Sequence, residues 1–356
     1  MLQKRILVVD DSVVIRRSLV EALTRHPGVM VAGSASSGRI ALMKMPLLRP
    51  DLVLLALDMP TTDGLDTLAA IRASYPATPV VLLNVATPHG AEVTSEALSL
   101  GAKGCVIKPD AAGRSTERLQ ALGAEVASLV GAWPFIRTDE PRVHVATVAG
   151  SVFPRRVDVV AIGVSTGGPS ALMDLLPDLP ADFPVPIVIV QHMPAEFTRL
   201  LAERLDAKCR IRVQEGRSRQ VLTPGTAWVA PGDFHMTVER DGLDVVMNID
   251  KRSRENSCRP SVDVLFRSIA HTFGSHALAV VMTGMGRDGV AGCQEIHAAG
   301  GHTIVQDELS SVVWGMPGLV VKAGLADQVV GLQRLAEAIT ARVAEHRTRM
   351  GDLVGR

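Results

Sequence analysis

The stretch VDVVAIGVSTGGPSALMDLL, residues 157–176, runs from an unbroken apolar segment through a glycine-rich turn into a helical pattern. A continuous apolar run of this length, bounded by turn residues, predicts a strand buried on both faces, as in a parallel sheet. Ser165 stands in the turn with glycines on both sides, and such a turn lifts a serine hydroxyl clear of the backbone. The following helix N-terminus supplies donors for developing negative charge. The stretch therefore predicts an α/β domain that presents a serine at the edge of its sheet.

Two simpler interpretations of this turn stay open on the motif alone. The spacing G-x-S-x-G is only moderately specific, and a glycine-rich phosphate loop or a plain tight turn would look the same. The stretch lacks both the lysine of a Walker loop and the glycine spacing of a dinucleotide-binding fold, which weakens a nucleotide-binding function. Catalysis by Ser165 therefore requires partners elsewhere in the chain.

Short apolar runs alternate with helical patterns on both sides of this stretch. Five runs precede it, RILVVD, VMVAG, DLVLLAL, PVVLLN and GCVIKP, at 5–10, 29–33, 51–57, 79–84 and 104–109. The runs PVPIVIVQH, TAWVAPG, GLDVVMNI, ALAVVMTG and HTIVQD follow it, at 184–192, 226–232, 242–249, 277–284 and 302–307. Helical patterns lie between most of them, as in SVVIRRSLVEALTRH, where Ile15, Leu19 and Leu23 share one face. Strands alternating with helices predict an α/β protein with doubly wound parallel sheets, with one antiparallel hairpin around 226–249.

The length of 356 residues predicts two domains. A stretch rich in prolines, arginines and acids, WPFIRTDEPRVHVATVAGSVFPRR, has no steady period and indicates a linker. We therefore expect an N-terminal (βα)5 domain over 1–115, a linker over 116–156, a C-terminal domain over 157–346 and a tail over 347–356.

Composition excludes several classes of protein. Lysine plus arginine equals aspartate plus glutamate, so the formal net charge is zero and no long-range field favours nucleic acid or an anionic membrane. Four scattered cysteines without a C-x-x-C pair argue against a zinc site and against a disulfide framework. No apolar run approaches the ~20 residues of a membrane span, so we expect a soluble, cytoplasmic protein that neither binds nucleic acid nor inserts in a membrane.

A nucleophilic serine needs a base, because a hydroxyl is a weak nucleophile at neutral pH. Of ten histidines, His192 ends the apolar run 184–192 and so projects at the carboxyl edge of the sheet, where open α/β sheets bind ligands. His235, after APGDF, and His302, which opens a strand, remain alternatives that lack this placement. His192 is therefore the predicted base.

The third group should be a carboxylate that holds the imidazole in the right tautomer. ALAVVMTGMGRDG places Asp288 after another strand, in a glycine-rich turn that opens a helix, where simple N-capping is its alternative role. The chain order Ser, His, Asp differs from the Ser, Asp, His order of α/β-hydrolases, and no HGGG-type loop is present. These features predict a serine hydrolase on a doubly wound sheet outside that family.

Six motifs, GVSTGG, QHMP, APGDFH, RPSVDVLF, TGMGRDG and IVQDE…WGMPG, resemble the catalytic domain of the CheB family of chemotaxis protein-glutamate methylesterases, from about 158 to 340. The resemblance implies hydrolysis of glutamate γ-methyl esters on the cytoplasmic helices of chemoreceptors, with methanol released, and in many members deamidation of receptor glutamines. It assigns Ser165 as nucleophile, His192 as base and then acid, and Asp288 as the orienting carboxylate. Met285 would offer its backbone N–H to the oxyanion, with Thr166 and Gly167 beside it, and no cofactor would be needed for catalysis.

The same family carries a response-regulator receiver domain at its N-terminus, and residues 1–110 resemble one. Such a domain needs acids after its first strand for Mg²⁺, an acceptor aspartate after the third and a lysine after the fifth. Asp10, Asp11 and Lys108 match this pattern. Three positions depart from it: the acceptor position is Ala56, the usual hydroxyl position after the fourth strand is Asn84, and the usual aromatic position is Cys105. Because alanine cannot take a phosphoryl group, we expect no phosphorylation at this position. For the metal, two interpretations stay open: a weak Mg²⁺ site at Asp10 and Asp11, or no bound ion.

Asp58 faces the same way as Ala56 but lies ~6–7 Å further along the strand. We expect it to line the receiver pocket with Asp10, Asp11 and Lys108 without accepting phosphate. In the family, the unphosphorylated receiver covers the active site, so here the block would be permanent, absent or lifted by another protein. The expected partners are a methylated chemoreceptor cytoplasmic domain and a sensor kinase or other signalling protein. The alternative function is a catalytically silent or phosphorylation-independent scaffold.

Overall fold

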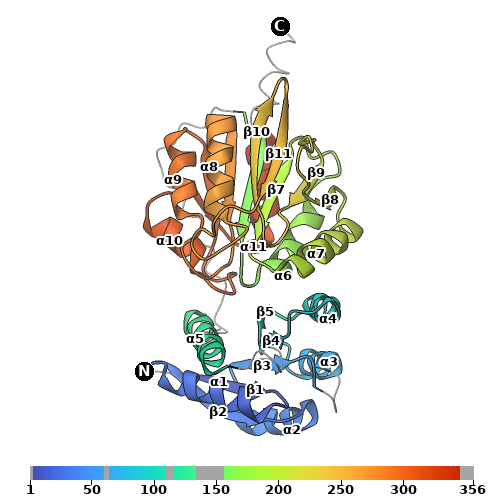
Figure 1. Cartoon of the computed structure of the whole chain (residues 1–356), viewed down its shortest axis with the longest axis vertical. Coiled ribbons are helices and arrows are strands. Elements are labelled where there is room, and N and C mark those ends of the chain that lie inside the picture. The colour runs from blue at the N-terminus through green and yellow to red at the C-terminus, as the bar shows by residue number, and fades with distance from the viewer. Residues whose placement is uncertain (1–2, 60–63, 110–114, 134–155, 345–356) are drawn as a thin grey trace. The chain divides into compact units, whose positions relative to one another are not determined.

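A computed structural model describes residues 3–59, 64–109, 115–133 and 156–344. The chain divides into two compact units, Met1–Asp139 and Glu140–Arg356. Both are α/β units built on parallel sheets, which confirms the predicted fold class (Figure 1). No helix in the described ranges combines the length and the apolar composition that crossing a bilayer requires.

The first unit alternates five strands with five helices. These are β1 Lys4–Val9, α1 Val13–Arg25, β2 Val29–Ala35, α2 Gly38–Leu48, β3 Leu52–Ala56, α3 Gly64–Ser74, β4 Val80–Asn84, α4 Pro88–Ser99, β5 Gly104–Ile107 and α5 Thr116–Ala132. The strands pair in the parallel order β2-β1-β3-β4-β5, so the carboxyl ends of β1, β3 and β5 meet at one edge. Helix α1 buries Ile15, Leu19 and Leu23, the face expected from their spacing.

Residues 116–132, predicted to belong to the linker, form α5 instead, so the linker prediction is wrong over this range. The helix begins at Ser115, whose hydroxyl accepts a hydrogen bond from Arg118 N–H. It packs against the first strand and first helix: Lys4 Nζ donates to the carbonyls of Val130 and Gly131 at 3.0 and 2.8 Å. Small residues between its buried apolar positions weakened the periodic signal. The rest of the predicted linker and the predicted tail lie outside the described residues, apart from Trp133 and Arg156.

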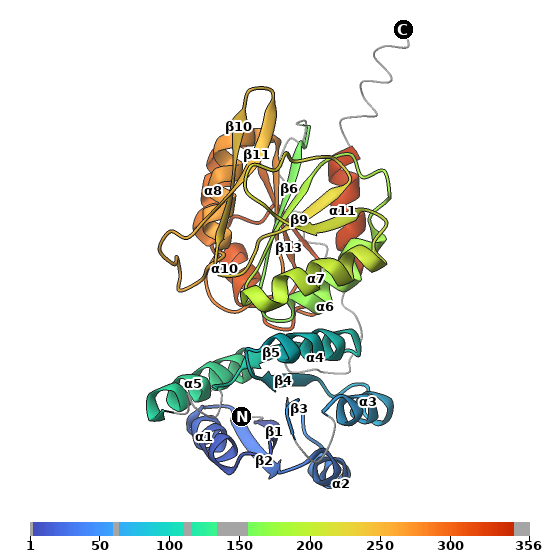
Figure 2. The same ribbon diagram turned by 45° about the vertical axis from the view of Figure 1, so that its right-hand side comes forward.

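The second unit holds a larger parallel sheet. Its elements are β6 Val159–Val164, α6 Gly168–Leu175, η1 Leu176–Asp178, β7 Ile187–Gln191, α7 Ala195–Lys208, β8 Arg212–Glu215, β9 Thr226–Val229, β10 His235–Asp241, β11 Asp244–Asp250, α8 Val262–Phe273, η2 Gly274–His276, β12 Ala277–Val281, α9 Val290–Ala298, β13 His302–Gln306, α10 Met316–Lys322, β14 Gln328–Val330 and α11 Leu332–Ala344. Seven strands run in the order β14-β13-β12-β6-β7-β9-β8. Helices α6, α7 and α11 cover one face and α8, α9 and α10 the other (Figure 2). The chain leaves β6 toward β7 and later returns to β12 on its other side, which makes the carboxyl ends of β12, β6 and β7 a topological switch point.

The predicted hairpin around 226–249 begins later than expected. Strand β9 belongs to the main sheet, parallel to β7, and the antiparallel pair is β10 with β11. This ribbon lies over α8, where Ser268 Oγ accepts from Val238 N–H and Thr272 Oγ1 donates to Val238 O. Strands β8 and β14 were not predicted, because four and three residues at the sheet edges carry little periodic signal.

Candidate active site

Ser165 follows β6 directly, in the turn that leads into α6. Its N–H donates to Thr283 O at 3.0 Å and its carbonyl accepts from Gly168 N–H at 2.8 Å, which closes the turn. Gly167 in this turn has a φ of 81°, a left-handed conformation that glycine adopts without strain. The turn leaves Ser165 and Thr166 half-buried at the carboxyl edge of the sheet.

His192 follows β7, the strand beside β6. Val164 pairs with Gln191 in the parallel register, so Ser165 and His192 are the next residues on neighbouring strands. The Gln191 side-chain amide donates to the carbonyls of both Ser165 and His192, each at 3.0 Å, and so ties the two strand ends together. The predicted nucleophile and the predicted base therefore come to the same edge of the sheet.

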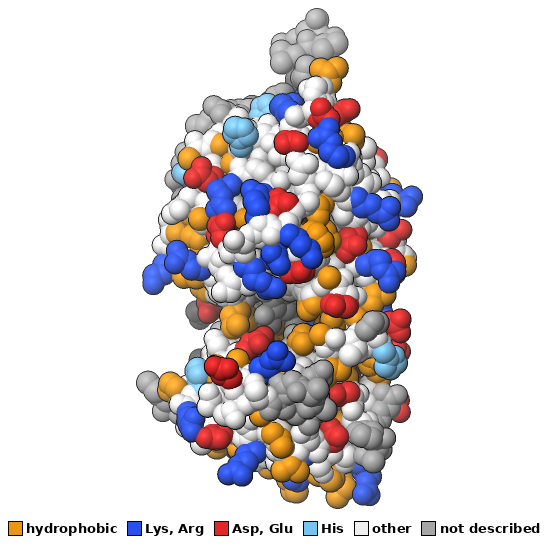
Figure 3. All heavy atoms as spheres, viewed as in Figure 1, with side chains coloured by type: hydrophobic (Ala, Val, Ile, Leu, Met, Phe, Trp, Pro, Cys, Tyr) orange, Lys and Arg blue, Asp and Glu red, His pale blue; other side chains and the backbone are white. Residues whose placement is uncertain are grey.

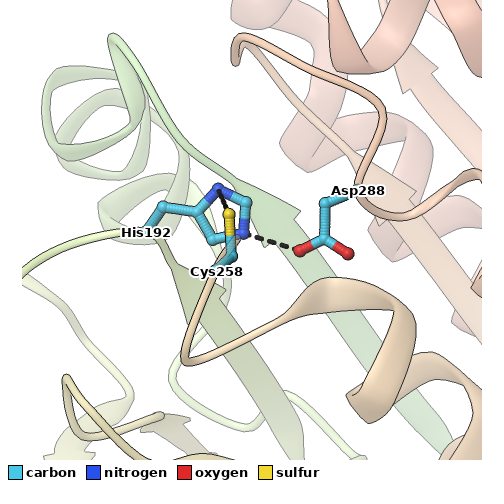
Figure 4. A group of neighbouring side chains, drawn as sticks. All are labelled: His192, Cys258 and Asp288. Carbon is cyan, nitrogen blue, oxygen red and sulfur yellow. Dashed lines mark hydrogen bonds and ion pairs between the residues drawn. The ribbon is translucent and has the colours of Figure 1, made fainter. Parts of the chain in front are cut away.

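Asp288 follows β12 and lies against His192. Its Oδ2 is 2.7 Å from His192 Nε2 (Figure 4). The same carboxylate accepts the N–H groups of Val262 and Asp263 at 2.7 and 3.0 Å, at the start of α8. N-capping of the following helix α9, its alternative role, does not occur, because the N-cap residue of α9 is Gly289 and no side chain caps this helix. Asp288 is 2 % exposed. The N-terminus of the neighbouring helix α8 stabilises the negative charge of the Asp288 carboxylate.

Cys258 occupies the other side of the imidazole. Its Sγ lies 3.7 Å from His192 Nδ1, and it reaches the ring from the loop that precedes α8 (Figure 4). Among the described residues, no hydrogen bond joins the Ser165 hydroxyl to His192. Catalytic contacts of this kind often close only when substrate is bound.

Three backbone donors lie in the serine turn or beside it. In the described ranges the N–H groups of Thr166, Gly167 and Met285 donate to no backbone carbonyl. Met285 follows Gly284, where a side chain would meet Ser165 Cβ at 2.8 Å, so the backbone of this loop approaches the serine closely. These N–H groups are available for an oxyanion beside Ser165.

The protonation of His192 follows from its two contacts. Burial, the largest single influence, lowers the pKa of His192, but Asp288 and Cys258 outweigh it and raise the pKa to about 9. Burial alone would raise the pKa of Asp288, whereas His192 and the backbone donors of Val262 and Asp263 hold it well below its usual range. Asp288 is therefore ionised, and it keeps the His192 proton on Nε2 and leaves Nδ1 as the basic nitrogen.

In the receiver-type pocket of the first unit, the charged side chains pair with one another. Lys108 Nζ lies 2.7 Å from Asp10 Oδ2 and 2.6 Å from Asp58 Oδ1. The remaining oxygen of Asp10 accepts Ser12 N–H at 2.8 Å, while Asp11 is exposed. Burial raises the pKa of Asp10, against the opposing effect of Lys108.

This arrangement does not fit a Mg²⁺ site. Mg²⁺ demands an octahedral shell of oxygen ligands, and the Lys108 ammonium stands where Asp10 and Asp58 converge. Ala56, fully buried at the end of β3, supplies no oxygen from its side chain. The weak Mg²⁺ site considered at Asp10 and Asp11 thus lacks support in the geometry.

The two other departures from the receiver pattern contact one residue. Asn84 Nδ2 donates to Thr94 Oγ1 at 2.8 Å, and Cys105 Sγ lies 3.8 Å from the same oxygen. Asn84 also donates to Gly90 O at 2.8 Å. These contacts fix the start and middle of α4 to β4 and β5, and burial raises the pKa of the Cys105 thiol to about 12.

Residues 160–339 match the family model described as CheB methylesterase, and residues 6–120 match that of the response regulator receiver domain. The chain belongs to the CheB methylesterase family. It is 44% identical to a protein of Trichodesmium erythraeum, with 95% of this chain and 99% of that one covered, and 43% identical to a protein of Nocardioides, with 96% of each covered. Both are named protein-glutamate methylesterase/protein-glutamine glutaminase. The solved CheB methylesterase catalytic domain of Thermotoga maritima is 39% identical, with a TM-score of 0.51 over 52% of this chain and 98% of that one.

Several residues around the CheB site were not predicted as site residues. Cys258 contacts His192, Asn256 Nδ2 donates to Asp288 Oδ1 at 3.0 Å, and Ser261 Oγ donates to the same oxygen at 2.8 Å. Of these three, Ser261 lies in the motif RPSVDVLF, which begins one residue after Cys258 and could have drawn attention to this loop. Of the alternative bases, His235 contacts Ser253 O at 3.0 Å and His302 lies 3.6 Å from Asp327.

Proposed function

We propose that this chain is a protein-glutamate methylesterase that hydrolyses glutamate γ-methyl esters with Ser165, His192 and Asp288. The observation that carries the proposal is the Asp288–His192 pair, 2.7 Å apart, at the strand end next to Ser165. A buried carboxylate that holds an imidazole beside a serine is the arrangement that activates a hydroxyl. Membership of the CheB methylesterase family supports the same chemistry.

In the first half of the reaction, His192 Nδ1 takes the hydroxyl proton of Ser165 while Oγ attacks the ester carbonyl carbon. The carbonyl oxygen becomes an oxyanion, and the N–H of Met285, with Thr166 and Gly167 beside it, donates to it. Asp288 stabilises the imidazolium that forms. The C–O bond to the methoxy group then breaks, and Nδ1 returns the proton so that methanol leaves.

In the second half, a water molecule loses a proton to Nδ1 and attacks the glutamyl ester carbon. The bond to Ser165 Oγ breaks, the serine regains its proton from the imidazolium, and free glutamate remains. With a glutamine substrate the same steps release ammonia in place of methanol. No step requires a cofactor.

The substrate we propose is the methylated cytoplasmic domain of a chemoreceptor, since the relatives are named for methylesterase action on protein glutamates and this domain would carry such esters. On the face of the second unit drawn in Figure 3, Lys and Arg side chains lie among Asp and Glu side chains. In the second unit, Arg254 and Arg259 of the loop before α8 both pair with Asp233 of the β9–β10 loop. A mixed surface of this kind suits a protein partner rather than nucleic acid.

We further propose that the receiver unit does not accept a phosphoryl group at the usual position. Ala56 offers no carboxylate there, and the Lys108 ammonium is already held by Asp10 and Asp58. Control by phosphorylation would then be replaced by contact with a signalling protein such as a sensor kinase.

Methanol release from a methylated receptor fragment tests the enzymatic proposal. The wild-type chain should release methanol, and Ser165→Ala should lower the rate by about 10³-fold or more. Ser170→Ala is the matched control, because Ser170 lies half-buried in α6 five residues further on and should keep the wild-type rate. No methanol from the wild-type chain would favour the scaffold function, and an unchanged rate in Ser165→Ala would exclude Ser165 as nucleophile.

A further inference from the structure

The spacing between His192 and Cys258 is that of two ligands on one metal ion. Zinc binds sulfur at ~2.3 Å and imidazole nitrogen at ~2.0–2.1 Å, so a tetrahedral ion would hold the two atoms ~3.6 Å apart. The observed separation of Sγ and Nδ1 is 3.7 Å. Side-chain ligand atoms of His192, Cys258 and Asp288 all lie within 4.8 Å of one another. We propose that His192 and Cys258 bind a Zn²⁺ ion that reversibly blocks the esterase.

Asp288 would serve this ion through His192 rather than bind it. Both its oxygens are engaged, one by His192 Nε2 and Val262 N–H, the other by Ser261, Asp263 and Asn256. Metal-bound histidines usually donate their second ring N–H to a carboxylate, which fixes the tautomer and strengthens the ligand nitrogen. The Asp288 contact does this in advance, because it leaves the lone pair of Nδ1 facing Cys258.

A tight turn brings Cys258 to the ring. Asn256 and Ser257 have φ values of 51° and 64°, and Glu255 and Cys258 exchange backbone hydrogen bonds of 3.1 and 2.8 Å around them. Two central residues with positive φ are typical of a two-residue type I′ hairpin. Arg267 anchors the turn from α8 with contacts of 2.8 and 2.5 Å to the two carboxylate oxygens of Glu255. The sulfur is thus held in place by a turn rather than by a free loop.

The chemistry of the pair suits a soft divalent ion. Thiolate and imidazole together favour zinc over magnesium or calcium. On binding, the Cys258 S–H proton leaves to solvent, the sulfur and Nδ1 each form a bond to the ion, and water completes the tetrahedron. Cys258 is half-buried and the His192 side chain is 12% exposed, so an ion from solvent can reach both. Two protein ligands give a reversible site rather than a structural one, which has four.

The inhibition rests on the proposed function of His192, whereas the binding does not. The ion would take the lone pair that must accept the Ser165 proton, so the bound enzyme cannot start the reaction. The proposed site differs from the expectation that scattered cysteines argue against zinc. It needs no C-x-x-C pair, because the fold brings Cys258 to a histidine 66 residues away in sequence.

Competition with a chromophoric zinc chelator measures binding by the full-length chain. We expect one Zn²⁺ per chain, and Asp288→Asn should weaken its binding by about 10–100-fold. Cys258→Ser removes a ligand outright and should weaken it at least as much. Cys209→Ser is the matched control, because Cys209 is half-buried after α7 and should not change the affinity. Equal zinc affinity in the Cys258→Ser and Cys209→Ser variants would overturn the site.

Two further readouts keep the test independent of catalysis and of variant folding. Co²⁺ in place of Zn²⁺ should give a thiolate charge-transfer band that Cys258→Ser loses and Cys209→Ser keeps. In the wild-type chain, Zn²⁺ should protect Cys258 but not Cys209 from alkylation, read by mass spectrometry of the peptides. Absence of both effects would refute the binding site. If zinc binds at Cys258 and methanol release is undiminished, the binding site stands. That result would refute the inhibition and the role of Nδ1 as base.

Discussion

His192 and Asp288 come from loops 96 residues apart in sequence, yet their side chains lie 2.7 Å apart at the carboxyl edge of one sheet. The contact takes up Nε2 and leaves Nδ1 as the nitrogen that would receive protons in the proposed mechanism. It also ties the ionisation of the proposed base to that of a buried carboxylate, so the proposed activity should depend on pH in a predictable direction.

The rate of ester hydrolysis should rise with pH through the pKa of His192. The base must be neutral, and Asp288 and Cys258 raise this pKa from 6.5 to about 9, so activity is low below the pKa and gained above it. A profile of kcat/KM against pH, recorded with EDTA to remove zinc, should therefore have its midpoint well above 6.5. Asp288→Asn should move the midpoint down as well as lower the plateau. A midpoint at or below 6.5 that Asp288→Asn leaves in place would contradict the pairing.

The receiver unit should take no label from a small phosphodonor. Ala56 lacks the acceptor oxygen, and Asp58 is held by Lys108 at 2.6 Å. Incubation with radiolabelled acetyl phosphate and Mg²⁺ should leave the chain unlabelled and its methanol release unchanged. Labelling that disappears in Asp58→Ala would show instead that Asp58 has taken over as acceptor.

Lys108→Met should destabilise the receiver unit. Lys108 is 2% exposed and neutralises Asp10, which is fully buried, so its removal leaves an unpaired buried carboxylate. Loss of one partner of a buried ion pair typically costs about 3–5 kcal/mol. Urea denaturation should show a loss of this order, while Arg17→Met, at an exposed position on α1, should stay within about 0.5 kcal/mol of wild type. A loss no larger than that of Arg17→Met would mean that the ion pair is not structurally required.

Gly168→Ala should disturb the link between the serine turn and the base. A Cβ at this position would overlap the Gln191 side-chain amide, which donates to the carbonyls of Ser165 and His192. Overpacking of this kind costs about 1–3 kcal/mol. If half of that cost appears in the transition state, kcat for ester hydrolysis should fall by about two- to twelvefold.

Gly242→Ala is the matched control for that variant. Gly242 lies at the β10–β11 turn with a φ of 62°, and a Cβ there would meet nothing within 4 Å. It should lower stability slightly through backbone strain and leave kcat unchanged. An equal loss of kcat in both variants would mean that the Gln191 link between Ser165 and His192 does not affect ester hydrolysis.

Much of the fold follows from local pattern. Continuous apolar runs such as 157–164 and 277–284, short and bounded by turn residues, favour buried strands, and residues that follow parallel strands reach one edge of the sheet. This reasoning led to Ser165, His192 and Asp288 as candidates, and the structure brings Asp288 into contact with His192.

Other features depend on contacts that no local pattern encodes. Helix α5 is defined by packing on α1 and β1, for example by the Lys4 bond to Val130 O. The position of Cys258 depends on two positive φ angles in a loop, at residues without glycine's usual signal. The Asp288 carboxylate caps the N-terminus of α8 rather than that of the helix that follows it in sequence, because the fold brings α8 beside the β12 edge.

Ser165 is the proposed nucleophile, activated by His192 and Asp288, and the site of a covalent adduct tests this role without relying on a receptor substrate. A fluorophosphonate reacts only with an activated nucleophile, and mass spectrometry of the digested chain locates the adduct. We expect one adduct per chain, on Ser165, absent from Ser165→Ala and retained in Ser170→Ala. An adduct on Cys258, the side chain that faces Nδ1 at 3.7 Å, or undiminished labelling of Ser165→Ala, would contradict it.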